Sequence, residues 1–157
     1  MGDELGSAVV AARLVRDLMR LCLLMKRRYP PYSKWLGSAF ARTAQAPALT
    51  PVITAALAAT DWRTREYHLA GAYEAVAVAH NQLGLTDPVD PATRPYHSRP
   101  FQVLHAERFT AALRVNITNP TISSLPAMGT VDQFIDSTDV LSRPELTRAS
   151  INGLLTS

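Results

Sequence analysis

The chain has 157 residues, 47% of them hydrophobic, and a formal net charge of only +3. A chain of this length buries enough surface for one ordinary core, so we expect a single domain over residues 1–157. The single cysteine, Cys22, cannot form an internal disulfide and lies in an apolar run, so we expect a buried side chain. That run is closed by Arg20 and Lys26 and is too short to span a membrane, and the acidic N-terminus is unlike a signal peptide. These features predict a cytoplasmic protein with no membrane partner.

The first predicted helix is long and basic. Apolar residues recur at three- and four-residue spacing over residues 5–29, and Tyr29-Pro30-Pro31 must end the helix. The N-terminal quarter of the sequence carries half of its lysine and arginine residues. Spacings of three, four and seven predict that four arginines share one face of this helix: Arg13, Arg16, Arg20 and Arg27. Such a stripe could meet phosphate, RNA or an acidic partner, or could be a solvated face that keeps the helix soluble.

The same reasoning gives about five main helices. They are expected at 5–29, 33–43, 51–59, 62–83 and 101–116, followed by short helices that begin at Pro120 and that cover 131–140 and 143–154. Thr50-Pro51 would start the third helix, Asp61 would cap the fourth, and Gly84 would stop it. Residues 86–100 contain four of the eleven prolines and predict a loop. Because no segment alternates with period two, we expect no real sheet, and the predicted fold class is all-α, a single-domain helical bundle.

The sequence lacks the pattern that nucleotidyl transfer requires. That chemistry uses a Gly-Ser turn followed by two carboxylates at i and i+2 on a strand, which clamp two metal ions. No two acidic residues have this spacing, and both Gly6-Ser7 and Gly37-Ser38 precede helical sequence. Phosphate-loop, dinucleotide, zinc-protease and nucleophile-elbow motifs are also missing. We therefore expect no nucleotidyl-transfer activity from this chain.

A metal site is the weaker of two interpretations of the acidic residues near the C-terminus. Asp132, Asp136 and Asp139 lie at offsets of four and seven, so in a helix they would share a face and could hold magnesium with water. The same carboxylates also serve as helix caps and favour helix N-termini. We expect no resident metal ion or cofactor, with magnesium as the alternative.

Residues 32–35, Tyr-Ser-Lys-Trp, are the short segment that most suggests a binding site in the sequence. Lys34 lies close to the aromatic residues Tyr32 and Trp35 just after a proline break, so it could contact a phosphate or another anion. The two aromatic side chains could equally be rim packing. Without a wider aromatic and basic surface, these residues do not predict nucleic-acid binding.

Further candidate binding residues lie in the proline-rich loop and just before it. Functional residues favour loops on a rigid scaffold, and the loop at about 86–100 contains Arg94, Tyr96, His97 and Arg99. His80 and Asn81 lie at the end of the fourth predicted helix, where they could contribute to a site or form a satisfied, partly buried pair.

Several stretches, spread in order over nearly the whole chain, resemble a known family. They are Gly-Asp-Glu-Leu-Gly-Ser at 2–7, Arg-Leu-Val-Arg-Asp-Leu-Met-Arg-Leu-Cys at 13–22, Tyr-Ser-Lys-Trp-Leu-Gly at 32–37, His-Asn-Gln-Leu-Gly-Leu-Thr at 80–86 and Val-Asp-Gln-Phe-Ile-Asp-Ser-Thr-Asp-Val-Leu at 131–141. The chain resembles the family called domain of unknown function 4037. In typical members this region follows a nucleotidyltransferase-like domain, which this chain is expected to lack. The resemblance implies a helical bundle akin to the C-terminal substrate domains of small-molecule nucleotidyltransferases, with Lys34 as a phosphate contact.

Three functional hypotheses follow. The leading one is a module that binds a small, anionic or phosphate-bearing molecule, with Tyr32, Lys34, Trp35, Asn81, Arg94, Tyr96 and Arg99 as ligand contacts. The second is a stand-alone metabolite enzyme of a biosynthetic pathway, an acid-base cyclase or isomerase, with His80, His97 and Asp136 as catalytic residues. The third is an interaction domain that forms a homodimer or binds a separate nucleotidyltransferase-like partner.

Overall fold

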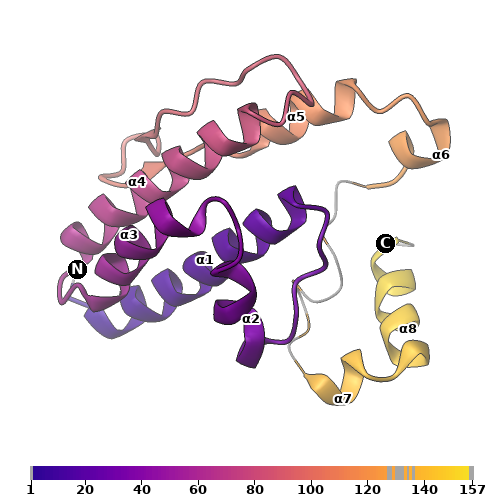
Figure 1. Cartoon of the computed structure of the whole chain (residues 1–157), viewed down its shortest axis with the longest axis horizontal. Coiled ribbons are helices and arrows are strands. Elements are labelled where there is room, and N and C mark those ends of the chain that lie inside the picture. The colour runs from indigo at the N-terminus through magenta and orange to yellow at the C-terminus, as the bar shows by residue number, and fades with distance from the viewer. Residues whose placement is uncertain (1, 127–128, 130–132, 134, 136, 156–157) are drawn as a thin grey trace. The chain divides into compact units, whose positions relative to one another are not determined.

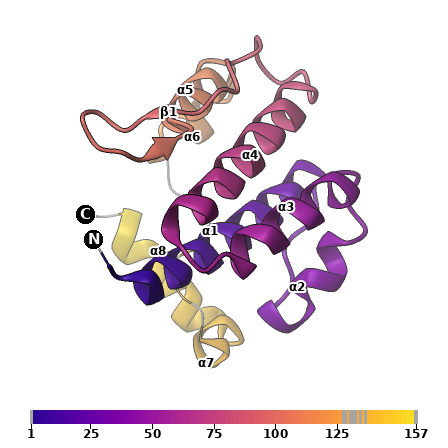
Figure 2. The ribbon, with the colours of Figure 1, turned by 90° about the vertical axis from the view of Figure 1, so that its left-hand side faces the viewer.

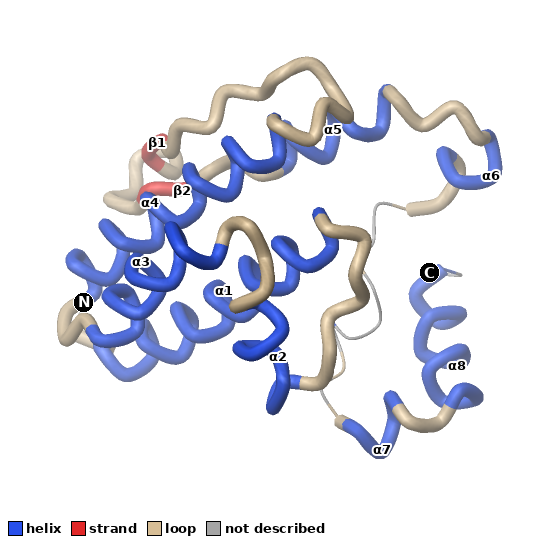
Figure 3. Tube along the Cα trace, viewed as in Figure 1, coloured by secondary structure: helices blue, strands red, loops and turns tan. Residues whose placement is uncertain are grey.

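The computed structural model describes residues 2–126, 129, 133, 135 and 137–155. The described residues are mostly helical, which confirms the all-α class, and they contain one pair of two-residue strands (Figures 1 and 3). In chain order the elements are α1 (Glu4–Met25), α2 (Ser33–Phe40), α3 (Ala46–Ala58), α4 (Trp62–Asn81), β1 (Arg94–Pro95), β2 (Gln102–Val103), α5 (Glu107–Val115), α6 (Pro120–Ser123), α7 (Thr138–Leu141) and α8 (Pro144–Leu155).

The chain divides into two compact units, Met1–Ala112 and Leu113–Ser157. The first unit contains α1 to α4, both strands and the first part of α5. The second contains the end of α5 and, among the described residues, α6, α7 and α8. Compact units defined by contacts need not fold independently, so the single domain over 1–157 stays a prediction.

The core of the first unit lies where α1, α3 and α4 pack side by side (Figure 2). Small residues in this core allow the helix backbones to approach closely, and larger apolar side chains fill the space that remains. Cys22 is fully buried, as expected, and burial raises the pKa of its thiol to about 11. The core cluster comprises Ala11, Val15, Cys22, Phe40, Ala46, Leu49, Ile53, Ala56, Leu69, Ala72 and Val76.

The first helix ends four residues earlier than the sequence predicts. The backbone N–H of Arg28 donates to the Leu23 carbonyl and that of Arg27 to the Leu24 carbonyl, which is a Schellman motif. Arg27 occupies its left-handed position, with φ 56°, and so lies beyond the helix. Arg20 is buried, at 7% exposed. The predicted exposed stripe of four arginines is therefore wrong, because one member leaves the helix and another turns inward.

Two other predicted helix starts are wrong. The third helix begins at Ala46 instead of residue 51, with Pro47 in its first turn and Pro51 inside it. A proline this close to the start removes only one backbone hydrogen bond of the helix, and the Thr50 hydroxyl donates to the Ala46 carbonyl at 2.7 Å. The fifth helix begins at Glu107 instead of residue 101, because the residues before it are used by β2 and the turn that follows it.

The fourth helix holds a long connecting segment along its side. Asp61 caps α4 by accepting from the Thr64 N–H at 3.0 Å, and Gly84 follows with φ 62°, both as predicted. Three side chains of α4 bind the backbone of residues 82–106, which we call the strap. The strap runs antiparallel to α4, since Asn81 binds Val89, Glu74 binds Thr93 and Glu66 binds Gln102.

Within the strap, β1 and β2 form an antiparallel pair in which Arg94 faces Val103 and Pro95 faces Gln102. Among the described residues this pair is the one exception to the expectation of no real sheet, and it leaves the all-α class unchanged. Period-two alternation cannot be detected over two residues, so the sequence gives no signal for it.

Candidate functional site

The hairpin of the strap carries the most compact group of candidate residues. The Tyr96 N–H donates to the Phe101 carbonyl at 2.7 Å, and the Arg99 N–H donates to the Tyr96 carbonyl at 3.0 Å, which closes the tip between β1 and β2. Phe101 packs edge-on against Trp62 at the start of α4, with ring centroids 5.9 Å apart. The tip is therefore attached to the helix by an aromatic contact in addition to the Glu66 to Gln102 hydrogen bond.

Three cationic or titratable side chains surround the ring of Tyr96. His97 lies at 4.7 Å and His105 at 6.4 Å between ring centroids, and the Arg99 guanidinium carbon lies 6.0 Å from the Tyr96 centroid. We call these four residues the Tyr96 cluster. Because β1 and β2 pair, His105 reaches the ring of Tyr96, which lies nine positions before it in the sequence.

Both histidines of the Tyr96 cluster adopt a backbone conformation that is uncommon for side-chain-bearing residues. His97 and His105 each have φ 55°, in the left-handed region. This region costs an L-residue roughly 1–2 kcal/mol relative to the right-handed one, although histidine tolerates it better than most residues do. Backbone strain of this kind is concentrated at binding and active sites, where the surrounding structure holds it in place.

Arg94 and His105 of the strap have acidic partners, whereas Arg99 does not form an ion pair with any described residue. Arg94 is paired with Asp90, whose pKa is lowered first by the Ala92 N–H and further by Arg94. His105 Nδ1 lies 3.0 Å from a carboxyl oxygen of Glu107, whose pKa is lowered first by its own backbone N–H and also by His105. Within the described part of the chain Arg99 forms no ion pair, so its exposed guanidinium is available to an anion.

The other predicted ligand contacts lie on a different part of the first unit. Tyr32, Lys34 and Trp35 lie at the start of α2, all exposed, with Lys34 Nζ 5.4 Å from the Trp35 ring centroid. Figures 2 and 3 both show α2 well apart from the β1 and β2 hairpin. The structure therefore divides the predicted ligand contacts into two groups instead of one pocket.

His80 and Asn81 have structural partners. Asn81 uses both ends of its amide, donating to the Val89 carbonyl at 2.7 Å and accepting from the Val89 N–H at 3.1 Å. The His80 ring packs edge-on against Phe109 at 5.3 Å, and neither of its buried ring nitrogens has a hydrogen-bond partner. The structure gives Asn81 the role of holding the strap and brings neither residue into contact with the Tyr96 cluster.

Of the three acidic residues proposed to bind magnesium, only Asp139 lies within the described residues. Asp132 and the candidate catalytic residue Asp136 lie outside the described residues, so that site and its role stay predictions. In the part of the chain that the structure describes, no three His, Cys, Asp or Glu side chains gather closely enough to share a metal ion. None of the helices among the described residues combines the length and the apolar character needed to cross a membrane.

Sequence reasoning missed His105 as a site residue and the Trp62 to Phe101 contact that attaches the hairpin. A histidine between a short strand and a helix carries no motif that could reveal its neighbour. Only the pairing of β1 with β2 brings His105 to Tyr96.

The described residues place the chain in the all-α class. The model of the family described as Domain of unknown function (DUF4037) matches residues 1–36, which comprise α1, the turn after it and the first half of α2. Among curated proteins and solved structures, no match to the chain is found.

Proposed function

We propose that this chain binds a small anionic molecule, with a phosphate or carboxylate group, at the Tyr96 cluster. The observation that carries the proposal is the gathering of Arg99, His97 and His105 around one aromatic ring on a hairpin tip. A guanidinium next to imidazole rings supplies hydrogen-bond donors for an anion, and the Tyr96 face suits a planar group attached to it.

The rigid support of the hairpin favours binding over a purely connecting role. The tip is fixed to α4 by the Trp62 to Phe101 contact and by the Glu66 to Gln102 hydrogen bond. A preorganised site loses less conformational entropy when the ligand arrives, so a few charge-assisted contacts can give measurable affinity.

As part of the same proposal, the chain is related to the helical region that follows a nucleotidyltransferase-like domain in family members. The match of the family model to residues 1–36 supports the family resemblance from which this relation is proposed. Under it, a phosphate-bearing metabolite is the first ligand class to test.

Calorimetric titration with phenyl phosphate and with inorganic phosphate tests the proposal. We expect phenyl phosphate to bind more tightly, since it can use both Arg99 and the Tyr96 ring. Arg99→Ala should weaken its binding about tenfold or more, because a charge-assisted hydrogen bond contributes about 1.5–3 kcal/mol.

Arg13→Ala, which removes an exposed arginine from α1, is the matched control and should leave the affinity unchanged. Equal weakening by both variants, or no binding of either phosphate, would contradict the proposal.

A further inference from the structure

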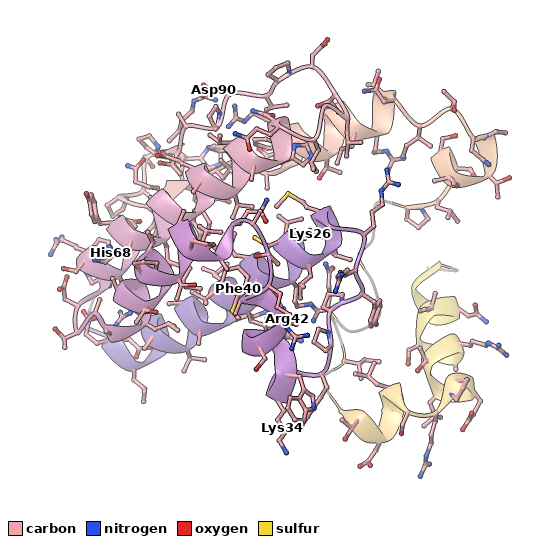
Figure 4. The ribbon with its side chains drawn as sticks, in the orientation of Figure 1. Lys26, Lys34, Phe40, Arg42, His68 and Asp90 are labelled. Carbon is pink, nitrogen blue, oxygen red and sulfur yellow. The ribbon has the colours of Figure 1, made fainter. Side chains whose placement is uncertain are left out.

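The segment from Lys26 to Arg42 forms a second cationic surface, which the Tyr96 cluster does not use. We call this segment the basic corner. It joins the end of α1 to the turn after α2, and Lys26 Nζ donates to the Arg42 carbonyl at 3.3 Å, which holds its two ends together. Figure 4 shows Lys34 projecting outward from α2, with Lys26 and Arg42 on the same side of the first unit. All five cations of the segment are exposed: Lys26, Arg27, Arg28, Lys34 and Arg42.

No acidic residue offsets these charges along the sequence. The stretch from Leu18 to Thr60 contains no Asp or Glu, although it passes through all of α2 and α3. The negative end of the α1 dipole favours the cations directly after it, but that effect is confined to the last turn and does not account for Lys34 or Arg42. A surface of one charge sign attracts a polyanion and raises its rate of association.

Three exposed aromatic side chains lie among these cations in the sequence. Tyr29, Tyr32 and Trp35 are 66%, 55% and 59% exposed, at intervals of three residues. Tyr32 has φ −48° and ψ 147°, near the polyproline II region, and it follows two prolines, whose rings fix φ close to the same region. The exposed Tyr32 ring can therefore stack on a planar group.

This composition fits single-stranded nucleic acid better than it fits a lipid surface. Every exposed large hydrophobic residue of the basic corner is a tyrosine or a tryptophan, and its other large apolar residues, Leu36 and Phe40, are buried. Interfacial membrane segments bury leucine and phenylalanine together with tryptophan, and no leucine or phenylalanine of the basic corner is exposed. Proteins that bind single strands combine cations along the backbone with aromatic rings on which bases stack.

We infer that the basic corner binds single-stranded nucleic acid, with Trp35 and Tyr32 stacking on bases and with Lys34, Arg28 and Arg42 contacting phosphates. The sequence alone argues against nucleic acid, because residues 32–35 are too small a surface. The structure enlarges that surface by bringing the end of α1 next to the turn after α2. Since this surface is separate from the hairpin, the inference does not depend on the Tyr96 cluster.

Fluorescence anisotropy of a labelled single-stranded RNA of about twelve nucleotides, within the usual range of site sizes, tests the inference. We expect binding that weakens with salt, with each phosphate contact adding about 0.7 to the slope of log affinity against log salt. Lys34→Ala should weaken binding and lower that slope by about one contact. Trp35→Leu should weaken binding about fivefold or more, whereas Trp35→Phe, which keeps an aromatic face, should weaken it much less.

Two controls make the result decisive. Arg148→Ala removes one exposed cation from α8 and should leave affinity and salt slope unchanged. Circular dichroism melting of each variant checks the fold, and Lys34→Ala alone is sufficient if Trp35→Leu fails to fold. The inference is overturned if the RNA does not bind at low salt, if a duplex of equal length binds as tightly, if a mononucleotide binds as tightly as the strand, or if Arg148→Ala matches Lys34→Ala.

Discussion

Helix α4 contacts the rest of the first unit through an apolar side and a polar side. On one side, Leu69, Ala72 and Val76 are buried against α1 and α3. On another, Glu66, Glu74 and Asn81 hold the strap through hydrogen bonds to its backbone. The apolar side is stabilised by its buried apolar area. The strap relies on a few hydrogen bonds of about 1 kcal/mol each and on the Trp62 to Phe101 contact at its hairpin. The part of the strap around Val89, away from the Trp62 to Phe101 contact that supports the hairpin, should therefore open at a lower free-energy cost than the three-helix core.

The largest effect is expected at Arg65, the buried charge on the apolar side of α4. Its guanidinium, 4% exposed, binds Glu4 at 3.2 Å, the Ser7 hydroxyl at 2.7 Å and the Ala59 carbonyl at 2.6 Å, which joins the starts of α1 and α4 to the end of α3. Arg65→Ala should lower the free energy of unfolding by about 2–4 kcal/mol, because it leaves a cavity and removes three hydrogen bonds to partly buried acceptors. Urea denaturation measures this change.

Arg63→Ala is the matched control for Arg65→Ala, because Arg63 is exposed on the same helix turn with its guanidinium 4.8 Å from the Trp62 ring centroid. We expect a loss of less than about 1 kcal/mol from this exposed cation–π contact. Similar losses for the two variants would show that the Arg65 bonds do not hold the helix ends together.

An intermediate effect is expected on the strap side. Asn81→Leu removes both amide hydrogen bonds to Val89, so the strap should loosen by about 1–2 kcal/mol. Hydrogen exchange by NMR should show faster exchange of the Val89 amide and no change at Val76 in the core. Gln82→Leu, one residue further along, is the control. If Val76 exchanges faster to the same extent, the strap and the core unfold together and the comparison between the two sides of α4 fails.

The smallest effect concerns pH. Two hydrogen bonds from Thr93, first from its hydroxyl and then from its N–H, lower the pKa of the Glu74 carboxyl below its ordinary 4.5. Since a lowered folded pKa favours the ionised form, this attachment is fully present above pH 4.5 and is lost as the pH falls through the lower folded value. The Thr93 amide shift should report that transition, and Glu74→Gln should remove it. A midpoint at or above 4.5 contradicts the assignment.

The parts of the fold that follow from short-range chemistry could be predicted. Asp61 caps α4 and Gly84 stops it, because each effect involves residues only a few positions away. The predicted start of α3 is wrong. Thr50-Pro51 is a valid local start signal, but the packing of Ala46 and Leu49 into the core overrides it. The end of α1 was also missed, because Arg27 takes a left-handed conformation usually given to glycine.

The sequence could predict which residues belong to the candidate sites, but it could not predict which of them lie together in the structure. Lys34, Tyr96, His97 and Arg99 stand out by type and by their proline-rich surroundings. Nothing in the spacing indicates that His105 reaches Tyr96, or that Asn81 is used to hold Val89.

The sequence by itself determined the helical class, the caps of α4 and the acid-free character of residues 18–60, because helical periodicity, capping and net charge are local properties. The tertiary structure decided which cations face solvent, how the strap is attached to α4, and which polar side chains share a surface. Those outcomes depend on contacts between segments that are distant in the chain. When one side of a helix is buried by such contacts, another side stays exposed and can bind a neighbouring segment or a ligand.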